Sequence, residues 1–353
     1  MPRPRLDPRT PLTELHVHLG AAVTPAVMWG IAHAQGIRLP TKDYWAFRDL
    51  ITVGPRHRGS GSFQAYLDLF RWTELIQSSP IAVERSIYEV IGGAYRKNNI
   101  TRIELRFNPM KRNRGGEQDL DHIIAAAVRG MDRAVLEYPQ VRAGLIFCLD
   151  RSFSRELNEI IAAKAIAWRS RGVVAVDIAG PTEPGFRFAD YRALFDECRR
   201  AGLGITVHAG EIGGADEVRE AVEALDPTRI GHGVKSAYDP AVMDLLRERG
   251  IVLEVCPTSN LNTRVVSDLA ELRLILRRFI DHQVPFTLST DGPEMLRSYL
   301  RDEIALLLRH EMMTLDEIQQ AIQTAHRASF VDGASVPISD GTGAAPIALE
   351  IEV

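Results

Sequence analysis

The sequence is poor in cysteine, and its three cysteines form no pairing pattern. Cys148, Cys198 and Cys256 lie far apart without a Cys-x-x-Cys pair, which argues against both a disulfide framework and a thiolate zinc site. Long apolar runs are also absent. The stretch Met1–Thr10 lacks the apolar core of a secretory signal, and no later run is long enough to span a bilayer. We therefore expect a cytoplasmic protein that does not enter a membrane.

An excess of charge of either sign is missing as well. The chain has 42 basic and 46 acidic residues, a formal net charge of -4, and these charges are spread through the sequence. Such a balance offers no broad cationic surface, so nucleic acid is not an expected partner. The 353 residues are 45% hydrophobic, which is enough to bury a large core. A single domain spanning residues 1–353 is therefore the first expectation, with no indication of its oligomeric state.

Short apolar runs rich in β-branched residues alternate with segments of helical periodicity, a pattern that predicts a parallel sheet. Eight such runs are present: Thr13–Leu19, Thr101–Phe107, Arg142–Leu149, Val173–Ala179, Gly204–His208, Thr228–Gly231, Ile251–Val255 and Pro285–Ser289. Amphipathic segments lie between them: Ile81–Lys97, Asp119–Leu136, Ser154–Ser170, Ala189–Arg200, Asp216–Ala224 and Pro240–Arg249. Together they predict an α/β fold, a (β/α)8 TIM barrel.

The interval between the first two predicted strands is unusually long. Residues 20–99 far exceed an ordinary connection, so we expect them to carry helices of their own and to form a lid over the barrel mouth. Within this interval, Gly54–Gly61 is typical of a loop, and Ser62–Leu75 predicts a helix with apolar residues on one side. Residues 332–353, rich in Gly, Ala and Pro, are expected to form a loose C-terminal tail.

Polar residues stand at the ends of several predicted strands, where barrel enzymes carry their catalytic groups. The first strand closes with His16-Val-His18, whose alternation places both imidazoles on one face. His208 closes the fifth strand, and Asp291 follows the eighth. Three imidazoles and a carboxylate form a nitrogen and oxygen set that suits Zn²⁺ better than Mg²⁺ or Ca²⁺. We therefore predict a zinc site formed by His16, His18, His208 and Asp291.

Two further groups, Glu211 and His232, follow the fifth and sixth strands and suit a hydrolytic reaction. Zinc lowers the pKa of its bound water to about 7, so hydroxide is the expected nucleophile. Attack on an aromatic ring carbon needs a proton at the neighbouring ring nitrogen, which Glu211 could supply if its pKa is raised. His232 could hold or deprotonate the attacking water. A single histidine is more often a packing residue, but six convergent ionisable groups without a function would be costly to desolvate.

With these residues in place, the sequence resembles the adenosine deaminase family of the amidohydrolase superfamily, from about Pro11 to Phe330. The matching pieces, in the family's order, are Glu14-Leu-His-Val-His-Leu19, Ile103-Glu-Leu-Arg-Phe-Asn-Pro109, Val174-Ala-Val-Asp-Ile-Ala-Gly180, Val207-His-Ala-Gly-Glu211, Ile230-Gly-His-Gly233, Glu254-Val-Cys-Pro257 and Ser289-Thr-Asp291. The resemblance implies a zinc aminohydrolase with one zinc ion per subunit. Its substrate would be a small molecule, an aminopurine or an adenosine-like nucleoside, from which it releases ammonia.

By this resemblance, the zinc ligands would be His16, His18, His208 and Asp291. Glu211 would protonate the ring and His232 would assist the water, as reasoned above. Asp291 would also orient the water. Gly180 would present its backbone N–H to a ring nitrogen of the base, a contact that a larger residue could obstruct; a simple turn glycine is the alternative. Phe63 and Leu67 would line the apolar entrance, although a buried lid core predicts the same residue types.

Two positions depart from the family pattern and concern the substrate. The family usually has an Asp directed to the ribose 5′-hydroxyl where this chain has Gly20 followed by Ala21. It also has a second Asp, bonded to purine N7, at the position of the candidate substrate contact Gly292. Losing a buried hydrogen-bond partner costs about 1–3 kcal/mol, which weakens the case for adenosine itself as the best substrate.

Several alternatives therefore stay open. The substrate could be free adenine, or a 5′-modified adenosine such as 6-aminodeoxyfutalosine, for which Gly20 would leave room. Arg56 and Arg58 in the lid loop could meet a carboxylate there, or be solvated loop charges. Glu104 and Arg106 are expected to form a structural ion pair.

Other reaction classes fit the sequence less well. Two-metal hydrolases of the superfamily typically need a lysine at the end of the fourth strand, and Val176-Asp-Ile-Ala-Gly180 contains none. Cytidine-type zinc deaminases need a Pro-Cys-x-x-Cys unit, which the sequence lacks. A non-catalytic binding barrel is the third alternative, because a fold alone does not establish a function.

Overall fold

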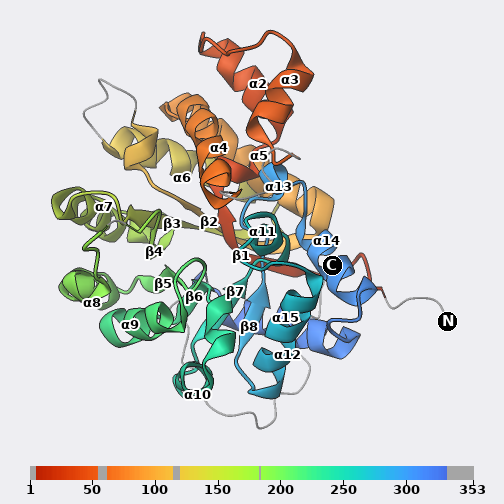
Figure 1. Cartoon of the computed structure of the whole chain (residues 1–353). Helices are drawn as coiled ribbons and strands as arrows, with labels where there is room; N and C mark the ends of the chain where they lie inside the picture. Colours follow the sequence, from red (N-terminus) through yellow and green to blue (C-terminus); the bar gives the residue numbers. More distant parts are fainter. Residues whose placement is uncertain (1–4, 55–61, 114–119, 183, 332–353) are drawn as a thin grey trace, which may run out of the picture.

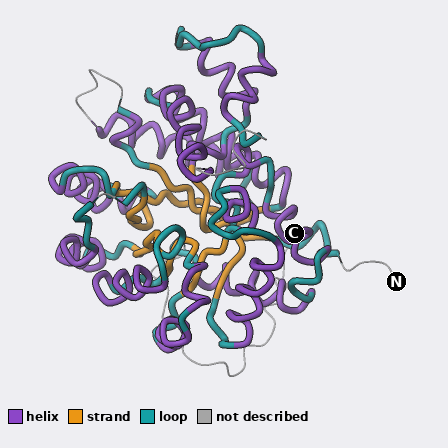
Figure 2. The backbone as a smooth tube through the Cα atoms, viewed as in Figure 1, coloured by secondary structure: helices purple, strands orange, loops and turns teal. Residues whose placement is uncertain are grey.

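Eight parallel strands form the centre of the molecule. The computed structural model describes residues 5–54, 62–113, 120–182 and 184–331. The strands follow one another around a barrel in chain order, with helices outside them (Figure 1 and Figure 2). They are β1 Leu12–His18, β2 Ile100–Phe107, β3 Arg142–Asp150, β4 Val173–Ala179, β5 Gly204–Ala209, β6 Arg229–His232, β7 Val252–Val255 and β8 Phe286–Leu288. The predicted (β/α)8 barrel is confirmed, and every predicted strand end lies within one residue of the observed one.

The strands are buried on both faces because helices cover the outside of the barrel while side chains fill its inside. All residues of β5, β6 and β7 are buried. The helices after β2 are α6 Leu120–Glu137, α7 Arg155–Ala167, α8 Arg192–Arg200, α9 Ala215–Leu225, α10 Pro240–Glu248, α11 Pro257–Asn262, α12 Leu269–Asp281, α13 Pro293–Leu296, α14 Leu300–Arg309 and α15 Leu315–Ala328. Short 3₁₀ turns η2 to η5 accompany them at Met110–Arg112, Arg169–Arg171, Phe188–Tyr191 and Val234–Tyr238.

Helix starts follow local sequence signals. Asp239 accepts a backbone hydrogen bond before α10, and Thr314 with Glu317 forms a capping box at α15. One predicted start was wrong: residues from Ala189 onward first form the 3₁₀ turn η4, and α8 begins at Arg192.

The long interval between β1 and β2 carries five helices in its described part: α1 Leu19–Ala22, α2 Pro25–Ala34, α3 Tyr44–Ile51, α4 Ser62–Ile76 and α5 Pro80–Asn98. Helices α2 and α3 project from the barrel at the top of Figure 1. Helix α5 packs beside α6 and β2 in the outer layer. The loop at residues 55–61 and the tail at 332–353 lie outside the described residues, and the lid stays a prediction. No described helix combines the length and apolar character needed to cross a bilayer.

The barrel closes between its last and first strands. Val17 of β1 forms a parallel bridge with Asp291, just after β8. The backbone N–H of His18 donates to the carbonyl of Asp291, and the N–H of Asp291 donates to the carbonyl of His16, each at 2.8 Å. The hydrogen bonds that close the barrel therefore also fix three of the four predicted zinc ligands.

Candidate active site

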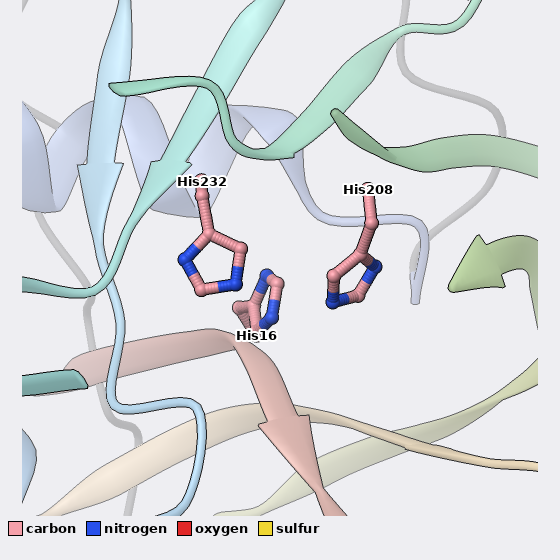
Figure 3. A group of neighbouring side chains, drawn as sticks. All are labelled: His16, His208 and His232. Carbon is pink, nitrogen blue, oxygen red and sulfur yellow. The ribbon is translucent and has the colours of Figure 1, made fainter. Parts of the chain in front are cut away.

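The predicted metal ligands come together at the carboxyl ends of the strands. His16 and His18 lie on β1, His208 lies on β5, and Asp291 follows β8. The Nε2 atom of His18 lies 3.3 Å from His208 Nε2 and 3.5 Å from Asp291 Oδ1. Ligand atoms of His16, His18 and Asp291 all lie within 4.8 Å of one another, as do those of His16, His208 and His232. Figure 3 shows the last three rings converging from three strands.

The free nitrogens of this cluster fit a zinc ion. His16 is fully buried, and its Nε2 has no hydrogen-bond partner among the described residues. An unpartnered buried polar atom is costly and indicates a ligand. Two nitrogens that bind one zinc ion at about 2.05 Å in tetrahedral geometry lie about 3.3 Å apart. The Nε2 atoms of His18 and His208 have this separation.

Two buried carboxylates orient the imidazoles from behind. Glu254 on β7 lies 2.7 Å from His16 Nδ1, and Asp177 on β4 lies 2.9 Å from His208 Nδ1. A carboxylate at Nδ1 holds the hydrogen there and leaves Nε2 as the ligand atom. Burial, with neighbouring cationic side chains, lowers the pKa of both His16 and His18 well below the ordinary value. Both rings are therefore in the neutral form that binds metal.

Buried arginines balance these carboxylates. Arg106 donates to Asp177 Oδ2 at 2.9 Å and to Glu254 Oε2 at 2.6 Å. Arg229 donates to Glu254 Oε1 and to Glu104 Oε2, both at 2.6 Å. Burial raises the pKa of Glu254, but the two guanidinium groups outweigh burial and hold that pKa at about 2. The predicted pair between Glu104 and Arg106 is wrong, because each of these side chains reaches an opposite charge on another strand.

Glu211 and His232 lie beside the ligand cluster. Oε1 of Glu211 is 3.6 Å from His232 Nε2, and both side chains have polar atoms within 4.8 Å of Asp291. Burial, reinforced by the charge of Asp291, raises the pKa of Glu211 well above its ordinary value. Burial and the neighbouring His208 lower the pKa of His232. Burial thus favours the protonated form of Glu211 and the neutral form of His232.

The tautomer of His232 depends on Asn260 of α11. His232 Nδ1 lies 3.1 Å from Asn260 Nδ2, and Asn260 Oδ1 has no partner among the described residues. In this orientation the amide donates to Nδ1, so Nε2 carries the hydrogen. With the amide turned by 180°, its oxygen would accept from Nδ1 and leave Nε2 unprotonated. The amide orientation decides whether His232 donates to a water molecule or takes a proton from it.

A cavity of about 630 Å³, including its open mouth, lies over Glu211 and His232. Phe63 and Leu67 of α4 and Gly180 after β4 contribute to its wall, where the sequence placed substrate contacts. Gly180 has φ +94°, and a Cβ there would stand 2.9 Å from Asp150 Oδ1. Any larger residue at this position would therefore be both strained and crowded.

The candidate substrate contact Gly292 is buried and is not among the residues that line this cavity. A Cβ at Gly292 would stand 2.6 Å from Ala21 Cβ and 3.1 Å from the Tyr66 hydroxyl. That hydroxyl donates to Asp291 Oδ2 at 3.2 Å. Tyr66 thus occupies the space into which a longer side chain at residue 292 would extend.

Gly20 has close neighbours on one side and lines a cavity on the other. A Cβ at Gly20 would stand 2.9 Å from the Phe70 ring and 3.2 Å from Arg112 Nη2. A side chain at residue 20 would therefore crowd α4 and η2, but Gly20 itself lines a cavity of about 1100 Å³, and its role in leaving room for a substrate stays a prediction. Arg56 and Arg58 lie outside the described residues.

Comparison with known proteins agrees with this geometry. The model of the adenosine deaminase family matches residues 11–336. The adenosine deaminase of Klebsiella pneumoniae subsp. pneumoniae is 33% identical over 316 residues, covering 90% of this chain and 92% of that protein. The enzyme of Shewanella loihica is 31% identical over 314 residues, covering 88% and 89%. The chain belongs to the adenosine deaminase family. Membership places it among the hydrolases that deaminate aminopurines.

Solved structures share the fold of this adenosine deaminase family member. The adenine deaminase of Arthrobacter aurescens superposes with a TM-score of 0.80 at 22% identity, covering 91% of this chain and 94% of that one. An amidohydrolase of Burkholderia ambifaria with bound zinc gives 0.76 at 23% identity, covering 92% and 87%. The N6-mAMP deaminase of Arabidopsis gives 0.76 at 21% identity, covering 92% and 94%.

Proposed function

We propose that the protein uses one zinc ion, held by the three ligand histidines and Asp291, to deaminate an aminopurine or an adenosine-like nucleoside by hydrolysis. The observation that supports this best is the carboxyl of Glu211, which lines the cavity beside the ligand cluster with Oε1 3.6 Å from His232 Nε2, and whose pKa burial raises. A site that only bound metal would have no use for a carboxyl with a raised pKa at the wall of a cavity.

A bound zinc ion supplies a Lewis acid that makes water a nucleophile at neutral pH. Glu211 donates its proton to the ring nitrogen beside the carbon that carries the amino group. His232 holds the attacking water, and His232 or Asp291 accepts a proton from it. The departing amino group takes up that proton and leaves as ammonia. Glu211 recovers its own proton from the hydroxyl that becomes the oxo group, so the cycle is balanced.

The remaining groups position the reacting parts. Ser259 donates to Asp291 Oδ2 at 2.6 Å and Tyr66 donates to the same oxygen, which leaves Oδ1 directed towards His18. Gly180 presents its backbone N–H to the base, and Phe63 forms an apolar side of the cavity. These contacts hold a flat heterocycle over the ligand cluster.

The test is ammonia release by zinc-loaded protein across adenine, adenosine, 5′-substituted adenosines, 6-aminodeoxyfutalosine, N6-substituted purines and aminopyrimidines. We expect release from at least one purine, and its loss in Glu211→Gln with zinc content unchanged. Glu159→Gln, which neutralises an exposed carboxylate on α7, is the matched control. If the zinc-bound protein released no ammonia from any compound of the panel, the result would contradict the proposal and favour a different hydrolysis or a binding role.

A further inference from the structure

A second cavity adjoins the candidate active site. It measures about 1100 Å³ including its open mouth. The two cavities share five wall residues: His18, Leu67, Phe70, Ala179 and Gly180. The rest of the second wall comes mainly from α4, from the end of β2 with the segment that follows it, and from the end of β3. A substrate with its base over the ligand cluster can therefore extend its other end into this second cavity.

The wall of the second cavity contains a buried arginine with unused donors. Arg112 of η2 is 2% exposed, and its Nε and Nη1 have no hydrogen-bond partner among the described residues. The nearby Glu74 Oε1 is 4.0 Å from Nη2, beyond hydrogen-bonding distance. Burial lowers the pKa of Arg112, but a guanidinium stays charged at neutral pH. A buried cation with unpaired donors is costly unless an anion accepts them.

The guanidinium of Arg112 lies close to the backbone of Gly20. Gly20 lies in the short helix α1, two residues after His18 of β1, and Arg112 Nη2 lies 3.2 Å from where a Cβ of Gly20 would stand. A side chain at residue 20 would therefore crowd both the Phe70 ring and the guanidinium. The absence of a side chain here brings a positive charge next to the active-site strand.

Arg106 also lines the second cavity, but it donates to Asp177 and Glu254, which leaves Arg112 as the buried lining cation without a hydrogen-bonded carboxylate among the described residues. Lys111 is half-buried, and its Nζ is neutralised by Asp150 Oδ2 at 2.6 Å. Asp68 and Arg71 line the same cavity but are exposed to solvent, where their charges are screened. A guanidinium presents a planar fork of donors that matches a carboxylate or a phosphate.

We propose that the second cavity binds an anionic group on the 5′ side of the substrate's ribose, with Arg112 as its main partner and Lys111 at its edge. The inference rests on the proposed function, because the base must occupy the first cavity for the sugar to enter the second. The substrate class is then an adenine nucleoside with an acidic 5′ substituent, either a phosphate or a carboxylate.

The experiment compares deamination of adenosine, 5′-deoxyadenosine, adenosine 5′-monophosphate and adenosine 5′-carboxylate by the zinc-loaded protein. Calorimetric binding of inosine and of inosine 5′-monophosphate gives a readout independent of turnover. We expect kcat/KM to favour the acidic nucleosides by about tenfold to a hundredfold, as for a charge-assisted hydrogen bond. The phosphate and carboxylate arms show which of the two anions fits.

The variants Arg112→Gln and Lys111→Gln test whether these two residues bind the anionic group. Arg112→Gln is expected to collapse the preference for acidic nucleosides, and Lys111→Gln, at a less buried position, to reduce it about threefold. Arg171→Gln removes an exposed charge at the opposite end of the barrel and should keep the wild-type preference. If Arg112→Gln does not fold, Arg112→Lys, which keeps the charge but loses the fork, takes its place and should reduce the preference.

The outcomes separate the two proposals. Deamination of adenosine with no preference for acidic 5′ groups would refute the anion site and leave the proposed function standing. A preference that survives substitution at both Arg112 and Lys111 would also refute it. Absence of both deamination and product binding with zinc present would refute both proposals.

Discussion

Glu254 and Glu303 are both buried carboxylates, and we expect opposite responses when their charges are removed. Glu254 lies between Arg106 and Arg229, and its pKa is held at about 2 instead of 4.5. At about 1.4 kcal/mol per tenfold change in proton affinity, folding favours its ionised form by about 3 kcal/mol. Because the folded pKa is depressed, this stabilisation is present above pH 4.5 and is lost as the pH falls through 2. Glu254→Gln leaves two buried guanidinium groups under-neutralised and should lower the unfolding free energy by about 3–5 kcal/mol at pH 8.

Glu303 on α14 provides the matched control. It is 1% exposed and accepts hydrogen bonds from Ser298 Oγ at 2.6 Å and from the Thr258 N–H at 3.0 Å. Burial outweighs these bonds and raises its pKa to about 7. At pH 8 the native state must therefore hold an unfavourable charge. Glu303→Gln keeps the shape of the side chain and removes this charge, so its unfolding free energy should match or exceed that of the wild type.

Urea denaturation of both variants and the wild type at pH 8, with a chelator present, measures this contrast without a contribution from metal binding. The chelator matters because Glu254 also contacts His16 Nδ1. Equal losses in the two variants would show that the buried charges do not act as described. A loss in Glu303→Gln larger than in Glu254→Gln would refute the reasoning outright.

Four further results are expected. Between pH 4.5 and 7 the folded protein binds the Glu303 proton more tightly than the unfolded chain, so wild-type stability should fall relative to Glu303→Gln as the pH rises; a constant difference would contradict this. Tyr66→Phe removes a donor to Asp291 and should lower kcat/KM about tenfold in steady-state assays. Gly180→Ala, crowded by Asp150 at φ +94°, should raise KM about tenfold at unchanged zinc content. Chelation should abolish ammonia release, and added zinc should restore it.

The barrel was predictable because its strands are short, apolar and separated by helices of regular periodicity. Parallel strands buried on both faces give continuous apolar runs, so their limits in the sequence are sharp. The metal ligands were predictable for a related reason: His18 ends the first such run, His208 lies one residue before the end of the fifth, and Asp291 follows the eighth. Local sequence is sufficient for both features.

The partners of the buried charges were not predictable from local sequence. Glu104 and Arg106 are two residues apart on β2, and this spacing suggested a local pair. In the barrel, both side chains are buried and reach across to other strands, to Arg229, Asp177 and Glu254. The available signal was a carboxylate within an apolar strand, as in Asp177 and Glu254, because burying such a charge is costly unless a cation or hydrogen-bond donors face it.

The surroundings of Gly20 depended on contacts distant in sequence. Whether a missing side chain leaves space is decided by what packs over it, here Phe70 of α4 and Arg112 of η2. Neither residue has a local pattern that assigns it to Gly20. The same holds for Tyr66 over Gly292. Helix α4 and the turn η2 bring such neighbours together only in three dimensions.

The closure of the barrel at Val17 and Asp291 has a consequence for how the protein is made. His16 and His18 leave the ribosome long before Asp291, because nearly the whole barrel lies between them in the sequence. The nascent chain cannot assemble the complete ligand set until its final strand has docked against its first. Metal capture by all four ligands is thus a late event of biosynthesis, and a chain released before Asp291 would carry three histidines without the seam that holds them.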